Sequence, residues 1–314
     1  MGGDLDRPGF LAIAERGIGD ALTMVPSLRA LRAAHPELRV ELLAPGLFPL
    51  AANLRDAATI LDHRPLTGLS ADQRLAWLRD RNTTWVWNTE AEAGAWSRAL
   101  PLAGRPTWIT APTQRHWRGQ VVQVRFEQLR GLFPDLRTVG GMDLSLTADQ
   151  ETVRRGLRMP GSTVIAIQPG AGAPGKLWPA EKFSELIIAL TQRESVVVLL
   201  FLSGEEPQFS ASGFLPVRDN LRLVQLPLAD ALPVLASADL FIGNDSGFAH
   251  LAFALGLRSV VIFRSLASAR RWGHRGARAR ALFPYVPKPF RGEWSRWVSV
   301  RRVLRSVRRL LPGV

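Results

Sequence analysis

The chain has 314 residues, 46% of them hydrophobic, and carries 40 Lys and Arg against 27 Asp and Glu, a formal net charge of +13. This length favours two domains, and the apolar content excludes a disordered or collagen-like chain. The longest uninterrupted apolar run, residues 196–202, is too short for a bilayer, which takes about 20 residues to span. Because cysteine is absent, disulfides and thiolate metal sites are excluded.

Arginine supplies nearly all of the positive charge, since lysine occurs only at positions 176, 182 and 288. A basic surface favours nucleic acid, anionic lipid or phosphorylated substrates as partners, but an arginine-rich composition with a solvated surface explains it equally well. The N-terminal residues include Asp4 and Asp6 where a secretory signal has basic residues, and residues 10–14 are too short for its apolar segment. We therefore expect a cytoplasmic protein.

The first half alternates between strand and helix patterns. The apolar run at residues 10–14 predicts a strand, a glycine turn follows at 16–20, and apolar residues spaced by three predict a helix over about 22–31. Residues 39–44 predict the next strand. Further strands are expected near residue 61 and at 84–87 and 108–110, and helices at 71–79, 94–100 and 120–132. This order is typical of a parallel sheet that binds its ligand at the carboxyl ends of the strands.

The second half repeats the alternation more clearly, after a linker that we expect at about residues 147–161. Strands are predicted at 164–168, 196–202, 222–225, 240–243 and 259–263, and helices at 181–192, 228–238 and 248–255. The natural architecture is two α/β domains with a cleft between them.

The tail, residues 294–311, is predicted to form an amphipathic helix. Apolar side chains from Trp294 to Leu311 share one helical face, and arginines lie mostly opposite them. Two compatible interpretations remain open. The helix covers apolar surface of a domain with its arginines in water, or it lies on an anionic membrane surface.

The first candidate site is the turn Arg-Gly-Ile-Gly-Asp at residues 16–20. Gly17 and Gly19 allow the backbone to approach a ligand, and the N–H groups that start the next helix favour anions. The third glycine of the dinucleotide fingerprint is missing. Asp20 has two interpretations: it caps the helix, or it is a general base that takes a proton from an acceptor hydroxyl.

The second candidate site is the glycine-rich stretch at residues 168–179. It follows a strand and carries Lys176 before a helix, as phosphate-binding loops do. Since Lys176 is not followed by Ser or Thr, a P-loop is excluded. Lys176 is either an ordinary surface lysine or a point charge that neutralises a diphosphate.

The third candidate site is Asn-Asp-Ser-Gly-Phe-Ala-His at residues 244–250, between a strand and a helix. In the simpler interpretation Asp245 or Ser246 only caps that helix. Gly247 leaves the first amides of the helix open, so a phosphate could bind there with support from the helix dipole. His250, one turn further on, either points at the same anion or is a structural buried histidine.

No metal site is predicted, because the five histidines are dispersed without a close pair. The pair Asp4 and Asp6 resembles a metal-binding aspartate pair, but it precedes the first strand and belongs to a loose terminus.

Together these segments resemble glycosyltransferase family 9, the heptosyltransferases of lipopolysaccharide core assembly. The resemblance lies in Gly-x-Gly-Asp and His-Pro within residues 16–54, in Gln-Pro-Gly-Ala-Gly and Lys-x-Trp-Pro within 168–179, and most strongly in 235–256. It covers most of the chain outside about residues 62–149.

The resemblance implies a GT-B fold of two Rossmann-like domains that face each other across a cleft. Residues 1–155 would bind the acceptor, 156–290 the nucleotide sugar, and 291–314 would form a basic C-terminal helix on a domain or on the membrane. The implied activity is transfer of a heptose-like sugar from a nucleoside-diphosphate donor, ADP-linked in the family, to a hydroxyl of a lipopolysaccharide-core or other surface-glycan acceptor, with inversion.

The resemblance also implies roles for individual residues. Asp20 matches the general base, and Lys176 matches the lysine on the donor phosphates. The donor-binding loop corresponds to Asp245, Ser246, Gly247 and His250. Glu206, or equally Glu205, would meet the ribose hydroxyls, and the backbone near Leu226 would line the adenine pocket.

The resemblance implies neither a metal nor a resident cofactor. The expected partners are the nucleotide sugar, an anionic glycolipid or glycan acceptor and the inner-membrane surface, and nucleic acid is not expected, because no recognisable binding motif is present.

One segment departs from the family pattern. After the last predicted strand the family has Phe-Gly-Pro-Thr-Asp-Pro, whereas residues 263–268 read Phe-Arg-Ser-Leu-Ala-Ser, so a glycine and an acid are gone and Arg264 is added. This departure motivates an alternative function, a sugar-nucleotide-binding protein without transfer activity.

Overall fold

The protein is described by a computed structural model. The structure describes residues 5–14, 17–89, 107–110, 119–203, 209, 215, 218–285 and 294–314. The chain divides into two compact units, Met1–Met142 and Asp143–Val314. Across these described ranges, no helix is both long and apolar enough to cross a bilayer.

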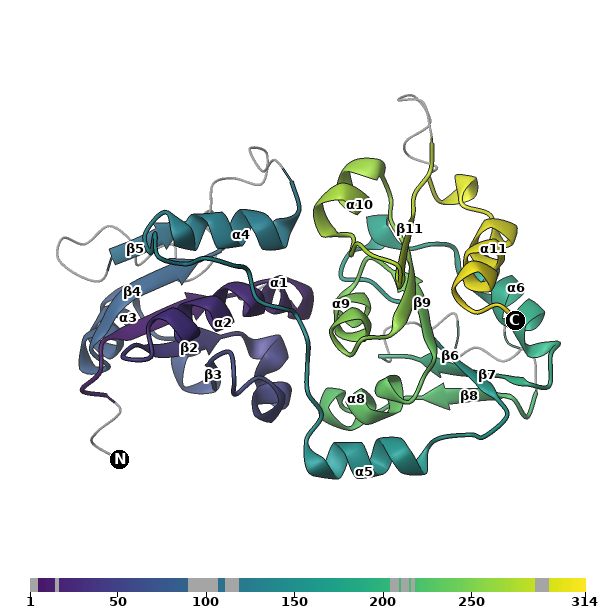
Figure 1. Ribbon diagram of the computed structural model, residues 1–314, viewed down its shortest axis with the longest axis horizontal. Helices are drawn as coiled ribbons and strands as arrows, with labels where there is room; N and C mark the ends of the chain where they lie inside the picture. The colour runs from purple at the N-terminus through teal and green to yellow at the C-terminus, as the bar shows by residue number, and fades with distance from the viewer. Residues whose placement is uncertain are drawn as a thin grey trace. The chain divides into compact units, whose positions relative to one another are not determined.

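The first unit contains a five-stranded parallel sheet in the order β3-β2-β1-β4-β5 (Figure 1). Its strands are β1 (Gly9–Ile13), β2 (Arg39–Leu43), β3 (Thr59–Leu61), β4 (Thr83–Asn88) and β5 (Thr107–Thr110). All five residues of β1 are buried, as expected of a central strand covered on both faces. Chain order reverses between β1 and β4, and α/β sheets bind ligands beyond the carboxyl ends of the strands at such a switch point.

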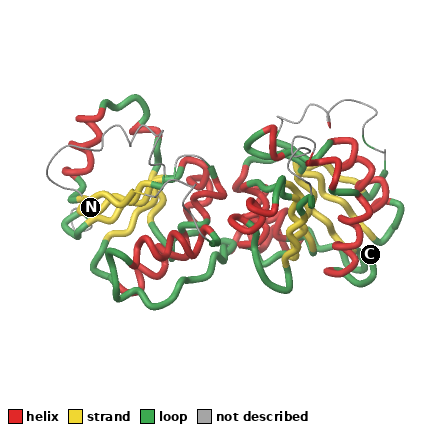
Figure 2. Tube along the Cα trace, turned by 90° about the horizontal axis from the view of Figure 1, so that it is seen from above, coloured by secondary structure: helices red, strands yellow, loops and turns green. Residues whose placement is uncertain are grey.

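Helices cover both faces of this sheet (Figure 2). They are α1 (Ile18–Leu22), α2 (Val25–Ala34), α3 (Ala71–Asp80) and α4 (Val121–Arg130), with 3-10 turns η1 (Pro45–Asn53) and η2 (Arg64–Leu66). The single helix expected over residues 22–31 is interrupted at Thr23 and Met24, where α1 ends and α2 begins. The helix expected at 94–100 lies outside the described residues.

The second unit contains a six-stranded parallel sheet in the order β11-β10-β9-β6-β7-β8. Its strands are β6 (Thr163–Gln168), β7 (Val196–Phe201), β8 (Leu221–Val224), β9 (Leu240–Asn244), β10 (Arg258–Ile262) and β11 (Ala279–Leu282). Here the switch point lies between β6 and β9. The two strands approach closely: a Cβ at Gly243 would lie 2.7 Å from the carbonyl oxygen of Gln168, so only glycine fits.

The helices of the second unit are α5 (Ala148–Gly156), α6 (Ala180–Thr191), α8 (Leu228–Ala236), α9 (Gly247–Ala254), α10 (Leu266–Trp272) and α11 (Val300–Leu310). The expected linker at 147–161 was wrong. It contains α5, which Thr147 starts with a capping box and which packs against α8. The division of the chain therefore falls after Met142 and not near residue 155. Helix α10 and strand β11 have no counterpart in the sequence prediction.

The C-terminal segment belongs to the second unit. Residues 294–297 form a 3-10 turn, and α11 begins only at Val300, after the N-cap Ser299. The helix packs on α6 and β10 (yellow in Figure 1) and buries Val303 and Val307 in the core of the unit. Lys182 of α6 ties the segment down by donating hydrogen bonds of 2.9–3.0 Å to three of its carbonyls, and burial lowers the pKa of this lysine.

Candidate active site

The predicted site residues lie at the two switch points, one in each unit. Gly17, Gly19 and Asp20 follow β1 in the first unit, and Lys176 and Asp245 follow β6 and β9 in the second. This placement arises from the parallel topology, which brings loops from distant parts of the sequence to one edge of each sheet.

Asp20 lies in the first turn of α1 but does not cap it. The N-cap is Gly17, and no side chain accepts a hydrogen bond at this helix start. Instead, Nη2 of Arg125 lies 3.2 Å from Oδ1 of Asp20. The capping interpretation of Asp20 is therefore wrong.

Arg125 comes from α4, and no pattern in the sequence indicated it. Its side chain is 1% exposed, and its Nη1 donates to the Asp20 carbonyl and to the hydroxyl of Thr23. A buried guanidinium with this fork of donors fixes both the backbone and the carboxylate of Asp20. Asp20 itself keeps 26% of its side chain exposed, so it remains accessible to a ligand while Arg125 orients it.

Gly17 of the same turn is less constrained. A Cβ at Gly17 would meet no atom within 4 Å, so nothing inside the unit demands glycine there. This open space would allow a ligand to lie close to the backbone of Gly17.

In the second unit, Lys176 and Asp245 form an ion pair between the two switch-point loops. The Lys176 Nζ lies 3.1 Å from Oδ2 of Asp245, whose side chain is 5% exposed. The same oxygen accepts a hydrogen bond of 3.1 Å from the hydroxyl of Ser268 on α10. Lys176 is thus no ordinary surface lysine, and the altered segment 263–268 supplies a partner to the candidate site.

Asn244 and Ser246 hold the surrounding loops. Asn244, fully buried at the end of β9, accepts from the Trp178 amide at 3.1 Å and donates to the Pro169 carbonyl at 2.5 Å. Ser246 caps α9 through Ala249, as the simpler interpretation held, and its hydroxyl lies 3.1 Å from the side-chain amide of Gln168. The start of α9 and the glycine-rich loop are therefore fixed to each other.

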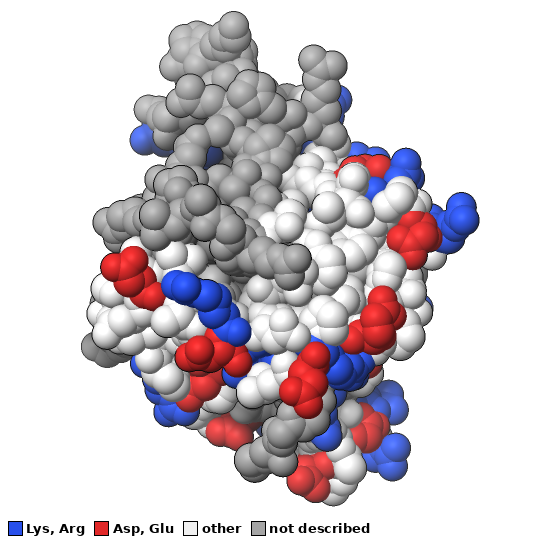
Figure 3. Space-filling model, turned by 90° about the vertical axis from the view of Figure 1, so that its left-hand side faces the viewer, with Lys and Arg blue, Asp and Glu red and all other residues white. Residues whose placement is uncertain are grey.

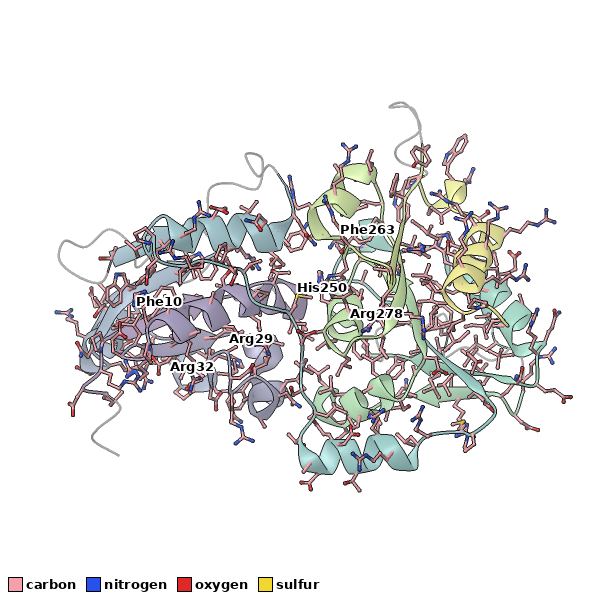
Figure 4. All side chains as sticks on the ribbon, viewed as in Figure 1. Phe10, Arg29, Arg32, His250, Phe263 and Arg278 are labelled. Carbon is pink, nitrogen blue, oxygen red and sulfur yellow. The ribbon has the colours of Figure 1, made fainter. Side chains whose placement is uncertain are left out.

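His250 lies on α9 (Figure 4) and is buried among rings. Its centroid is 4.8 Å from that of His274 and 6.2 Å from that of Trp272, both edge-on. His274 in turn stacks on Phe253 at 3.8 Å. Burial, with a smaller contribution from His250, lowers the pKa of His274 to about 2.

This pKa shift predicts that acid destabilises the second unit. His274 stays neutral in the folded protein, whereas in the unfolded chain it gains a proton below its ordinary pKa of about 6.5. Its contribution to stability is therefore complete above pH 6.5 and is lost as the pH falls toward 2. Between pH 7.5 and 5 we expect a loss of about 2 kcal/mol in the free energy of unfolding. Urea unfolding of the wild type and of His274→Phe at both pH values measures it, and an equal loss in both proteins would contradict the assignment.

The other residues predicted to bind the donor are Leu226 and Glu206, or equally Glu205. Leu226 follows β8 and is 49% exposed, so it is available to a ligand. Glu205 and Glu206 lie outside the described residues. Among the residues that the structure describes, no three His, Cys, Asp or Glu side chains gather to hold a metal ion.

Comparison with known proteins bears on both units. The sequence model of glycosyltransferase family 9 (heptosyltransferase) matches residues 130–283, a range that includes the glycine-rich loop and all of residues 244–250. The predicted resemblance to family 9 is confirmed. A lipopolysaccharide heptosyltransferase 1 of Campylobacter coli is 32% identical over 114 residues, which are 34% of this chain and 33% of that enzyme. The match thus spans about a third of the length of this curated relative.

Solved structures with the same fold extend over nearly the whole chain. ADP-heptose lipopolysaccharide heptosyltransferase II of E. coli has a TM-score of 0.75 and 18% identity, covering 97% of this chain and 98% of its own. A family 9 glycosyl transferase of Veillonella parvula has a TM-score of 0.77 and 16% identity, covering 100% and 99%. The E. coli heptosyltransferase WaaC with ADP-2-deoxy-2-fluoro heptose has a TM-score of 0.62 and 16% identity, covering 95% and 98%. The predicted GT-B fold is confirmed.

Proposed function

We propose that this family 9-like protein is a glycosyltransferase that moves a heptose-like sugar from a nucleoside diphosphate to a hydroxyl of a lipopolysaccharide-core or other surface-glycan acceptor. The observation that carries the proposal is the ion pair of Lys176 with Asp245 at the switch point of the second unit, within the segment that the family model matches. The heptosyltransferase relatives, one of them with an ADP-heptose analogue bound, support an ADP-linked donor.

In the proposed reaction each unit supplies one half of the chemistry. The carboxylate of Asp20 takes the proton from the acceptor hydroxyl as its oxygen forms a bond to the anomeric carbon. The bond between that carbon and the diphosphate breaks, and its electron pair leaves with the diphosphate. Attack from the side opposite the leaving group inverts the anomeric centre. Lys176 and the first amides of α9 stabilise the charge that develops on the diphosphate.

The alternative, a sugar-nucleotide-binding protein without transfer activity, is not favoured. It was motivated by the altered segment at residues 263–268. In the structure, Ser265 caps α10 and Ser268 donates to the buried carboxylate of Asp245, so the altered residues have ordered roles beside the candidate donor site.

A thermal-shift screen tests the proposal, because a ligand that binds only the folded state raises the melting temperature. We expect ADP-sugars to stabilise the protein at concentrations where UDP-, GDP- and dTDP-sugars do not. When the concentration of the donor is a hundred times its Kd, the free energy of unfolding should rise by about 2.7 kcal/mol. Stabilisation by none of the four donor classes would contradict the proposed function.

We also propose that the protein works in the cytoplasm, at the inner-membrane surface, through the outer face of α11. Arg301, Arg305, Arg308 and Arg309 are exposed there, and within the described ranges none of them forms an ion pair. Residues 294–314 contain no acid, whereas basic and acidic side chains are interspersed on the face shown in Figure 3. Such a cationic face complements anionic lipid headgroups.

Flotation with lipid vesicles measures the proposed binding of α11 to anionic lipid. Each arginine near an anionic surface contributes about 1 kcal/mol, so replacing all four by Gln should weaken binding to phosphatidylglycerol vesicles at least about a hundredfold. The matched control replaces four arginines that line a separate groove of the same unit, Arg154, Arg158, Arg258 and Arg278. Equal losses in the two variants would show that only total charge matters and would contradict the assignment to α11.

A further inference from the structure

Arg264 occupies the end of β10, at the same edge of the sheet as Lys176 and Asp245. It follows Phe263, labelled in Figure 4, and precedes Ser265, the N-cap of α10. Its Nη1 lies 4.0 Å from the position that a Cβ would take at Gly175, the residue before Lys176. The guanidinium group therefore lies beside the glycine-rich loop that is the candidate phosphate-binding element.

The Lys176–Asp245 pair by itself provides no net positive charge for a diphosphate. Lys176 is 3.1 Å from the carboxylate of Asp245, so the two charges of this pair sum to zero. A diphosphate carries at least two negative charges and gains more as it leaves. The amides of α9 interact with the diphosphate only as dipoles, and the charge of Lys176 is already neutralised by Asp245. These groups alone therefore bring no net positive charge to the ligand.

Arg264 supplies the missing positive charge. It is exposed, and it forms no ion pair with any residue that the structure describes. An arginine also presents several N–H donors in one plane, which matches two oxygens of a phosphate better than a lysine does. The charges of Lys176, Asp245 and Arg264 together sum to +1.

We propose that Arg264 binds the diphosphate of the donor, and that Lys176 is held in place by Asp245 to act beside it. This inference rests on the proposed function, since it names a further binding residue of the same site. The proposal gives a role to the segment in which the chain departs from the family pattern. The added arginine strengthens the binding of a diphosphate that carries two or three negative charges.

Titration with nucleotides and nucleosides tests the assignment. The probes are ADP, UDP, GDP and dTDP, each compared with its own nucleoside, by calorimetry on the full chain. For the diphosphate that the wild type binds best, Arg264→Gln should weaken binding roughly 10- to 100-fold, the loss expected for a hydrogen-bonded charge pair. Binding of the nucleoside should not change, and Arg264→Lys should recover part of the loss.

The matched control is Arg270→Gln, which removes another exposed arginine, from the other end of α10. It should bind diphosphates like the wild type. Diphosphate binding by Arg264→Gln at wild-type strength would overturn the assignment, and so would an equal loss for diphosphate and nucleoside, which indicates a structural role. If the wild type binds none of the four diphosphates, the donor site itself, and with it the proposed function, is wrong.

Discussion

Replacing Asp20 by Asn should lower the turnover number for sugar transfer about 10²- to 10⁴-fold, the usual contribution of a general base. The amide cannot accept the proton of the acceptor hydroxyl, but its oxygen can still accept the hydrogen bond from Nη2 of Arg125, which lies 3.2 Å from Oδ1 in the wild type. The affinity for the donor should not change, because the proposed donor residues lie in the other unit. Steady-state transfer assays, with donor binding measured by calorimetry, provide both quantities.

The choice of Asn matters because Arg125 is almost completely buried. Asp20→Ala should also abolish transfer, but it leaves a buried guanidinium without its carboxylate and should cost about 1–3 kcal/mol of stability as well. A loss of transfer in Asp20→Ala alone could therefore reflect misfolding, whereas in Asp20→Asn it reflects chemistry. Melting temperatures of the two variants separate these effects.

Asp56→Asn is the matched control, since Asp56 is also paired with an arginine of the first unit. Arg29 of α2, labelled in Figure 4, lies 2.7 Å from its carboxylate, but that carboxylate is 63% exposed and is far in sequence from the switch-point loops. Ion pairs of this exposed kind contribute little. Normal turnover in Asp20→Asn would remove Asp20 from the mechanism, and an equal loss in Asp56→Asn would attribute the effect to charge in general.

The sequence predicts the two sheets well, because buried parallel strands are short apolar runs separated by helical patterns. It fails where the signal is not apolar periodicity. Helix α5 has no buried residue and was therefore mistaken for a linker, although the capping box of Thr147 and Gln150 was present in the sequence. The start of α11 was placed too early because Trp294 continues the apolar spacing of the tail, whereas the cap at Ser299 decides where the helix begins.

The residues of the candidate site were also predicted only in part. Glycine turns and the polar residues after strands are visible in the sequence because they stand next to apolar runs, so Asp20, Lys176 and Asp245 were found. Their partners were not, because Arg125 comes from a helix about a hundred residues away and Ser268 from a helix with no clear pattern. Which arginine of so many is buried against a carboxylate depends on tertiary packing, which no local pattern encodes.

The Lys176 substitution should have the largest effect on donor binding. In Lys176→Met we expect affinity for the nucleoside diphosphate to fall about a hundredfold, for two reasons of similar size. The contact of the ammonium with the phosphate is lost, and the nearly buried carboxylate of Asp245 is left without its cation at 3.1 Å. The summed charge of residues 176, 245 and 264 then falls from +1 to zero, and the uncovered carboxylate repels the ligand.

The double variant Lys176→Met with Asp245→Asn separates the two contributions. It removes the uncovered carboxylate and restores a summed charge of +1 for residues 176, 245 and 264, so about tenfold of the lost affinity should return. The transfer rate should stay low, because the charge on the leaving diphosphate still lacks the ammonium group, a loss of roughly 10²- to 10³-fold for such stabilising groups. Lys182→Met is the control, since that lysine donates to carbonyls of the C-terminal segment and lies over the Trp178 ring, and it should change stability without changing nucleotide affinity. Full recovery of transfer in the double variant would mean that Lys176 serves only to neutralise Asp245.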